Sequence, residues 1–166
     1  GLPMQSLVLD WQIQLGVLAT TAYAMLLGGT IGYERELKDR PAGFRTHMLV
    51  AGAAAMLVGL TDLLAQRFSG EGYSELVSLD PIRLIEAMVA AVGFLGAGTI
   101  FRNSGDSVVH GITTAASLLM VAVIGIAAGL HSHVLALGAT ALTLGVLVLL
   151  GWLERRVAPA QGGPAA

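Results

Sequence analysis

The chain has 166 residues, of which 55% are hydrophobic and only 12% are charged, and its mean hydropathy is +0.75. Soluble domains usually carry about 25% charged residues, so this composition disfavours a soluble bundle and predicts a polytopic membrane protein. The net charge of −2, without a large basic patch, excludes a nucleic-acid partner. The lack of cysteine excludes disulfides and thiolate metal sites.

Five apolar runs follow one another along the chain, each near the 20 or so residues that a helix needs to cross a bilayer. They cover residues 11–33, 43–64, 82–101, 108–128 and 134–152. We therefore expect an all-α fold with five transmembrane helices at residues 11–156. An extracytoplasmic tail at residues 1–10 precedes it, and a disordered tail at residues 157–166 follows it.

The polar segments between these runs contain helix signals. Glu34 and Lys38 are four residues apart, so the first helix is expected to continue for one turn beyond its apolar part, and Pro41 ends it. Asp80 followed by Pro81 is typical of a helix start, with a capping side chain and a proline in the first turn.

Glycine is concentrated in the apolar runs. The segment at residues 87–101 contains three glycines in a GxxGxG spacing, which differs from the nucleotide-binding spacing and lacks a strand before it. Two further pairs have GxxxG spacing. In a bilayer, glycine lets two helices approach closely, so we expect all seven to be helix contacts within or between protomers. They are Gly28, Gly32, Gly93, Gly96, Gly98, Gly125 and Gly129.

Two short motifs recur with nearly constant spacing. Residues 27–31 resemble residues 96–100 at an offset of 69, and residues 43–46 parallel residues 111–114 at an offset of 68. The pattern indicates a repeat of two-helix units, spans one and two with spans three and four, plus a fifth helix. Chance similarity among small apolar residues is the alternative.

The basic residues predict the orientation. With the N-terminus outside, only Arg67 and Arg83 fall outside. The basic residues that fall inside are Arg35, Lys38, Arg40, Arg45, Arg102, Arg155 and Arg156. This bias predicts an N-terminus outside and a C-terminus in the cytoplasm of a bacterium.

A polar site is predicted at the inner face, where the second and fourth helices begin. Helix N-termini have free N–H groups and partial positive charge, and Thr113 and Thr114 lie at one of them. With Arg45 and Arg102 nearby, this face is suited to an anion or to a carboxylate such as Glu34. The alternative is that the arginines simply extend to lipid headgroups.

The outer ends of the second and third helices contain carboxylates. Asp62 and Glu86 together would suit Mg²⁺, which prefers one or two carboxylates and retained waters; an interfacial salt network is the alternative. His131 and His133 lie in an outer loop without evident partners for zinc binding. Because no nucleophile–base arrangement stands out, we expect no enzyme activity and no cofactor beyond a magnesium ion at Asp62 and Glu86.

Three motifs together resemble the MgtC/SapB family of bacterial inner-membrane proteins. They are GGTIGYERE at residues 28–36, RPAGFRTH at residues 40–47, and GFLGAGTI with GITTAAS at residues 93–100 and 111–117. By this resemblance, the recurrent polar positions of the family fall on Glu34, Arg35, Arg40, Arg45, Arg102, Thr113 and Thr114. Members often have a tryptophan near Leu119, which is absent here, and virulence-type members carry a soluble C-terminal domain.

The resemblance implies a membrane domain without established catalysis, linked to magnesium limitation, survival inside host cells, acid resistance and restraint of ATP synthase. We therefore expect a protein of magnesium-linked homeostasis or stress survival that regulates ion balance. One alternative is a transporter or channel for magnesium or another cation. Another is a module that binds and modulates a membrane complex such as ATP synthase. A homodimer in the lipid bilayer is also expected, because several glycine faces leave one available for self-association.

Overall fold

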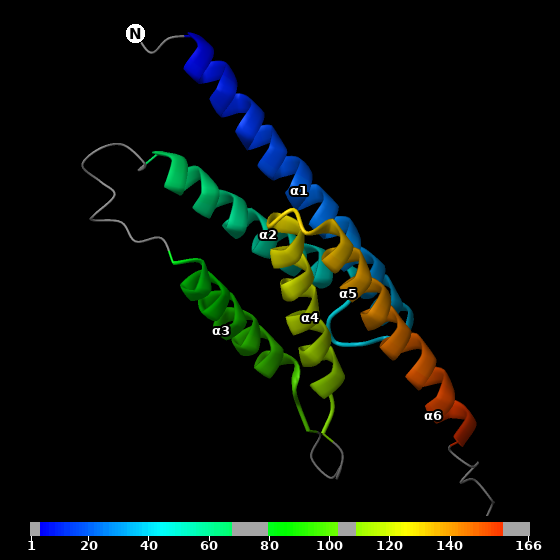
Figure 1. The fold of residues 1–166 in the computed structure, drawn as a ribbon. Helices are drawn as coiled ribbons and strands as arrows, with labels where there is room; N and C mark the ends of the chain where they lie inside the picture. Colours follow the sequence, from blue (N-terminus) through cyan, green and yellow to red (C-terminus); the bar gives the residue numbers. More distant parts are fainter. Residues whose placement is uncertain (1–3, 68–79, 103–108, 158–166) are drawn as a thin grey trace, which may run out of the picture.

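The computed structural model describes residues 4–67, 80–102 and 109–157. Its helices are α1 (Met4–Leu37), α2 (Phe44–Arg67), α3 (Pro81–Thr99), α4 (Ile112–Gly129) and α5 (His133–Gly145), which continues through the π-helical turn η1 (Val146–Leu150) into α6 (Gly151–Val157) (Figure 1). Among these described residues, five helical stretches are long and apolar enough to cross a membrane. The predicted all-α fold with five spans is confirmed.

The start of α3 follows the predicted capping pattern. Asp80 is the capping residue, and its side chain accepts a hydrogen bond from the N–H of Ile82 at 2.9 Å. Pro81 occupies the first turn, where its missing N–H costs nothing. The end of α1 also follows expectation, since the helix continues past Tyr33 as far as Leu37.

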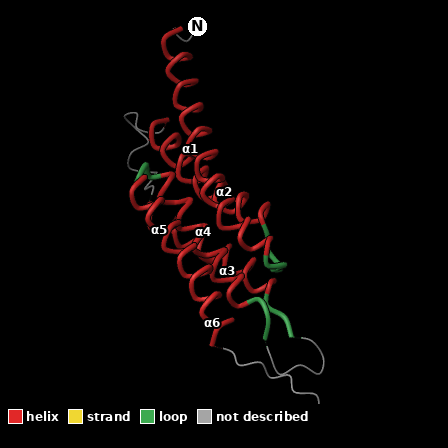
Figure 2. Tube along the Cα trace, turned by 90° about the vertical axis from the view of Figure 1, so that its right-hand side faces the viewer, coloured by secondary structure: helices red, strands yellow, loops and turns green. Residues whose placement is uncertain are grey.

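Several helix ends differ from the prediction. The first helix begins at Met4, and its N-terminal end projects beyond the other helices (Figures 1 and 2). Between α3 and α4, Phe101 and His110 pair in an antiparallel bridge, with N···O distances of 3.1 and 2.9 Å. This bridge requires extended backbone, so the third span ends at Thr99 and the fourth begins at Ile112. Residues 68–79, 103–108 and 158–166, where we predicted a loop, a polar turn and a tail, lie outside the described residues.

Helix α4 occupies the centre of the bundle and packs against α1, α2, α3 and α5 (Figure 1). In its apolar stretch, 61% of the residues are buried, against 17% in α3 and 17% in the helix that starts at α5. The largest fully buried side chains of α4 include Leu118, Val121 and Ile124. These residues form the core together with small residues from α2, such as Ala51 and Ala54.

Glycines bring α4 and α2 into close contact. A Cβ atom added at Gly125 would overlap the carbonyl oxygen of Ala51, and one added at Gly129 would lie 2.7 Å from Cβ of Val58. Real side chains essentially never approach so closely. Only glycine at these two positions permits the observed distance between the helices.

The other predicted contact glycines fall into two groups. Gly28 and Gly32 of α1 face α2, where an added Cβ would lie 2.6 Å from the His47 carbonyl oxygen and 2.8 Å from the His47 Cβ, respectively. In α3, Gly96 faces Ala115 of α4 at 3.1 Å. By contrast, Gly93 and Gly98 have no atom of the described chain within 4 Å of an added Cβ, so they make no such contact inside this part of the protomer.

The two helix pairs share two local hydrogen bonds. In each first helix, a threonine hydroxyl donates to the carbonyl three residues earlier at 2.7 Å, from Thr30 to Leu27 and from Thr99 to Gly96. At the start of each second helix, a glycine carbonyl (Gly43, Gly111) accepts the N–H four residues later. Ser117 and Ser132 make the same two kinds of bond outside the repeated motifs, so these bonds do not distinguish a repeat from chance similarity.

Candidate functional site

Polar and charged side chains are buried or half-buried where α1 ends, α2 begins and α4 enters the bundle. We call this group the buried polar cluster; its members are Glu34, Arg35, Lys38, His47 and Ser117. Charged residues inside a membrane bundle are expensive and usually mark function, so this cluster is the candidate site.

The carboxylate of Glu34 is held by two cations. Arg35 donates to Oε2 through its guanidinium, and the ammonium of Lys38 forms an ion pair with Oε1. Arg35 is only 3% exposed and Glu34 only 9%. A buried charge is tolerated when it is paired, and the two cations also lie near the C-terminal end of α1, where the helix dipole favours positive charge.

Lys38 connects this group to the fifth span. Its Nζ donates to the carbonyl oxygen of Leu147 at 3.0 Å, and Gly151 leaves room beside the ammonium. Leu147 belongs to the π-helical turn η1, where the backbone departs from regular α-helical bonding. Lys38 thus joins the end of α1 to the one segment of the fifth span with altered backbone geometry.

His47 is fully buried and connects α2 to α4. Its Nδ1 lies 2.8 Å from the carbonyl oxygen of Gly43, and its Nε2 lies 3.0 Å from Oγ of Ser117. The Ser117 hydroxyl in turn donates to the carbonyl oxygen of Thr114 at 2.8 Å. A chain of three polar contacts therefore runs from the α1–α2 turn through α2 into the first turns of α4.

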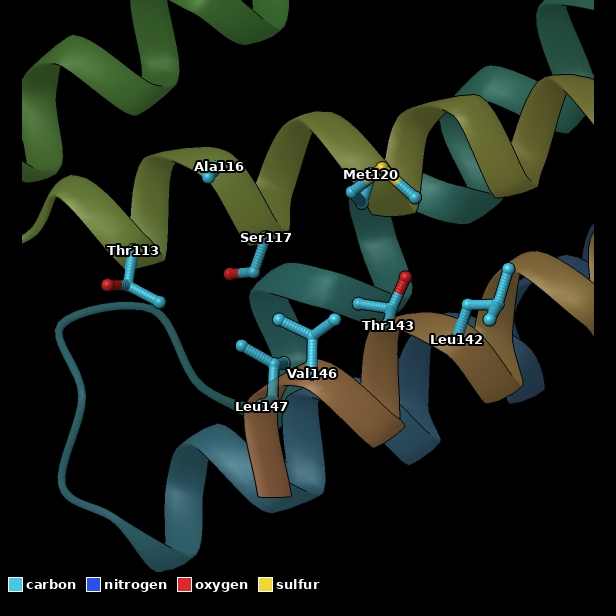
Figure 3. Close-up of a pocket in the computed structure, with 8 residues that line it drawn as sticks. All are labelled: Thr113, Ala116, Ser117, Met120, Leu142, Thr143, Val146 and Leu147. Carbon is cyan, nitrogen blue, oxygen red and sulfur yellow. The ribbon is translucent and has the colours of Figure 1, made fainter. Parts of the chain in front are cut away.

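A cavity of about 240 Å³ lies between α4 and the α5–η1 helix (Figure 3). It is lined by Thr113, Ala116, Ser117, Met120, Leu142, Thr143, Val146 and Leu147. The lining atoms are almost all apolar, and the hydroxyl of Thr143 is bonded to its own helix at Ala139. The cavity is suited to an apolar group, and Ser117 belongs to both its wall and the buried polar cluster.

Some of the predicted inner-face residues are buried together, and the others are exposed. Glu34 and Arg35 come together, and Thr114 is buried beside them in the His47 network. Arg40 and Arg102 are exposed. Thr113 is also exposed and lines the cavity.

Arg45 is not a partner of Glu34, whose carboxylate is held by Arg35 and Lys38. Arg45 is exposed and lines an open hollow with Glu36 and the start of α2. The carboxylate of Glu36 accepts the N–H of Phe44 at 2.9 Å. Since Arg35 is adjacent to Glu34 on the same helix end, it reaches the carboxylate more easily than a residue beyond the turn.

The predicted outer sites remain separate from this cluster. Asp62 and Glu86 are exposed, and the described residues contain no group of three His, Cys, Asp or Glu side chains that could hold a metal. His131 is exposed, as predicted, and so is His133, whose ring packs edge-on against Tyr23 with ring centres 5.4 Å apart.

Sequence reasoning did not include Lys38, His47 or Ser117 among the site residues. A signal was present for His47, because it is the one ionisable side chain in the otherwise apolar run at residues 46–61. The four-residue spacing from Glu34 indicated the ion pair of Lys38, but nothing indicated its hydrogen bond to the Leu147 carbonyl, which lies 109 residues away.

These features define a class: a polytopic helical membrane protein whose apolar helices surround a central span and share a buried charged cluster at one end. Comparison with known proteins then assigns the family. The sequence pattern of the MgtC family matches residues 21–156, and the chain belongs to this family.

Three relatives illustrate the similarity. Protein SapB of Bacillus subtilis is 34% identical over 153 residues, covering 92% of this chain and 64% of the relative. Protein MgtC of Brucella abortus is 41% identical over 125 residues, covering 74% of this chain and 47% of the relative. Protein MgtC of Salmonella typhimurium is 38% identical over 134 residues, covering 81% and 52%. The chain thus spans about half to two thirds of these relatives, and no solved structure matches it significantly.

Proposed function

We propose that this protein acts in magnesium-linked ion homeostasis of the bacterial inner membrane, as a non-catalytic regulator of ion balance. Membership of the MgtC family supports the biological setting. The observation that carries the proposed mode of action is the pairing inside the buried polar cluster. Glu34 is held by Arg35 and Lys38, and His47 is held by Gly43 and Ser117.

The pairing favours regulation over ion conduction for a physical reason. A site for a partly dehydrated cation needs oxygen ligands that the protein leaves available. Here the one buried carboxylate of the described helices already has two cations on it, which would repel a further one. The other contacts of the cluster link helices: Lys38 joins the end of α1 to η1, and His47 joins α2 to α4. Such links are expected of a module that responds to its surroundings or binds another membrane protein.

A flux measurement combined with a growth measurement tests this proposal. Protein reconstituted in liposomes with an enclosed Mg²⁺-sensitive dye should give no Mg²⁺ entry above that of empty liposomes. The same chain should restore growth at low magnesium to a strain lacking its own relative, and Arg35→Gln should lose that restoration. Mg²⁺ entry that depends on protein and is abolished by Arg35→Gln would establish the transporter alternative instead.

The orientation is part of the same proposal, with the N-terminus outside and the C-terminus in the cytoplasm. Because the chain lacks cysteine, each introduced cysteine is a unique label site. In intact cells, a membrane-impermeant maleimide should label cysteines at Ser74 and Ser132 but not one at Ser104. Labelling at Ser104 alone would invert the proposed orientation.

A further inference from the structure

His47 and Ser117 together make one more polar contact than a neutral ring and a hydroxyl have hydrogens to fill. The carbonyl oxygen of Gly43 can only accept, so Nδ1 donates to it across 2.8 Å. The carbonyl oxygen of Thr114 can likewise only accept, so its 2.8 Å contact with Ser117 is a hydrogen bond only when that hydroxyl donates to it. When it does, the contact between Nε2 and Oγ of Ser117 at 3.0 Å needs a hydrogen on Nε2.

Counting hydrogens separates the two protonation states. A neutral imidazole and a hydroxyl carry two polar hydrogens, which leaves one of the three contacts unmade. An imidazolium and a hydroxyl carry three, and all three contacts are made at once. In the neutral state with Nδ1–H retained, the Ser117 hydroxyl must rotate away from Thr114 to donate to Nε2. The proton on His47 and the direction of the Ser117 hydroxyl are therefore linked.

From this count we propose that His47 is a proton-binding site inside the helix bundle, with Ser117 as the residue that responds to its occupancy. Proton uptake at Nε2 turns the Ser117 hydroxyl onto the Thr114 carbonyl. Proton release turns it back towards His47. Ser117 also lines the cavity between α4 and the α5–η1 helix, so the residue that responds to the proton belongs to the wall of that cavity (Figure 3).

Few charged groups act on His47. From α1, Glu34 and Arg35 interact with the ring through their charges, and these two are paired with one another. Lys38 is directed at Glu34 and Leu147. The central helix contributes no ionisable side chain between Ile112 and Gly129, and α5 contributes none after His133. Within α2, the nearest charged side chain in sequence is Arg45, which is exposed.

The Nδ1 side of the His47 ring lies near an open hollow. Gly43 lines this hollow at the α1–α2 turn, together with the carboxylate-bearing Glu36. Nδ1 contacts the carbonyl of this same glycine, whereas Nε2, which takes up the proton, faces Ser117 on the other side of the ring. Imidazole is also the side chain whose ordinary proton exchange falls between about pH 5 and 8, where cellular conditions vary.

The test is nitrogen NMR of the full chain in lipid nanodiscs, with ¹⁵N-labelled histidine. The chain has four histidines, and His47→Gln identifies the signals of His47. As the pH is lowered from 8 to 5, both ring nitrogens of His47 should change from the two distinct shifts of a neutral tautomer to the similar shifts of an imidazolium. A ring that keeps one neutral tautomer across this range would overturn the proposal.

Variants at the cavity wall test the role of Ser117. Ser117→Ala removes the oxygen that accepts a hydrogen bond from protonated Nε2. The imidazolium loses more stabilisation than the neutral ring does, because hydrogen bonds from a charged group are stronger. We expect half-protonation of His47 to need a proton concentration about tenfold higher. Ser117→Thr, which keeps the hydroxyl, should titrate like the parent.

Thr143→Val is the matched control, because Thr143 lines the same cavity but bonds only to Ala139 of its own helix. It should leave the titration of His47 unchanged. If Ser117→Ala also titrates like the parent, Ser117 does not respond to the proton and the proposal fails. If Ser117→Ala does not fold, the separate pH titrations of the parent chain and of Ser117→Thr still decide whether His47 binds a second proton.

Discussion

The fourth and fifth spans have almost the same apolar character but opposite positions in the molecule. Both lack charged residues, from Ser107 to Leu153, and the fifth is slightly the more hydropathic of the two. Yet 61% of the apolar stretch is buried in the fourth span and only 17% in the fifth. In a bilayer, apolar side chains are stable against lipid and against protein alike, so hydropathy does not select the central helix.

Residue size accounts for the difference. Gly125 and Gly129 in α4 lie against the α2 backbone, so a side chain at either position would overlap its neighbour. Gly138 and Gly145 in the fifth span have no atom of the described chain within 4 Å of an added Cβ. The fifth span instead has a polar tether, the hydrogen bond from Lys38 to the Leu147 carbonyl. Close packing against α2 thus fixes the position of α4, whereas the fifth span is linked to α1 by the hydrogen bond from Lys38.

The largest effect is expected from the same substitution made in both spans. Gly125→Leu places four carbons where even one overlaps the Ala51 carbonyl, and overpacking by single methylenes already costs about 1–3 kcal/mol. Gly125→Leu should therefore lose the folded, monodisperse form in mild detergent. Gly138→Leu, the matched control, should unfold within about 1 °C of the parent. Equal behaviour of the two variants in thermal unfolding would break the comparison.

A smaller effect is expected from removing the tether. Lys38→Met keeps the side-chain length but removes the ion pair to Glu34 and the hydrogen bond to the Leu147 carbonyl. Hydrogen bonds to charged groups contribute about 1.5–3 kcal/mol, and unfolding in detergent should be easier by about that amount. Arg40→Met removes the same charge from an exposed position nearby and should change little. A stable Lys38→Met protein would show that the fifth span needs no tether.

Self-association provides a third test. The apolar stretch of α3 is as little buried as that of the fifth span, so α3 also has a face available to a second copy of the chain. We propose a homodimer whose interface includes the exposed glycines of α3. A Cβ added at Gly93 meets no atom of the described residues within 4 Å, so Gly93→Leu should change the stability of a single protomer by no more than about 0.5 kcal/mol. Light scattering in detergent should show a dimer for the parent and a smaller species for Gly93→Leu. A parent that is monomeric in several mild detergents would contradict the dimer.

The smallest effect is expected at Arg45. Its side chain is exposed, and Glu34 already has Arg35 and Lys38 as partners. Lysine also carries a positive charge on a long stem, so Arg45→Lys should change the free energy of unfolding by less than about 0.5 kcal/mol. A loss of several kcal/mol would mean that Arg45 makes a two-pronged contact with a buried group.

Local features of this fold could be predicted from the sequence. Five apolar runs separated by charged or polar segments locate the spans. Asp80 with Pro81 marks a helix start because capping depends only on neighbouring residues. The bridge between Phe101 and His110 was not predictable, since it depends on pairing across a turn. Nor was the order of burial, because glycine in α3 and glycine in α4 look alike until their neighbours are known.

The candidate site could be predicted only where its contacts join residues that are close in the sequence. Glu34 and Lys38 are one helical turn apart, so their pairing follows from spacing. His47 and Ser117 are 70 residues apart, and only the packing of α2 on α4 brings them together. Arg45 was expected near Glu34 because both lie at the same membrane face, but membrane depth does not determine which cation reaches a carboxylate.

Cysteine cross-linking in the membrane tests most directly whether α4 is the central helix. An added Cβ at Gly96 of α3 would lie 3.1 Å from Cβ of Ala115 in α4, so cysteines at these two positions are close enough to form a disulfide after a small adjustment. With a mild oxidant, the pair at Gly96 and Ala115 should lose both free thiols in a maleimide mass-shift assay. The pair at Gly96 and Gly138 should keep them. Cross-linking of Gly96 to Gly138 without cross-linking to Ala115 would contradict the central position of α4.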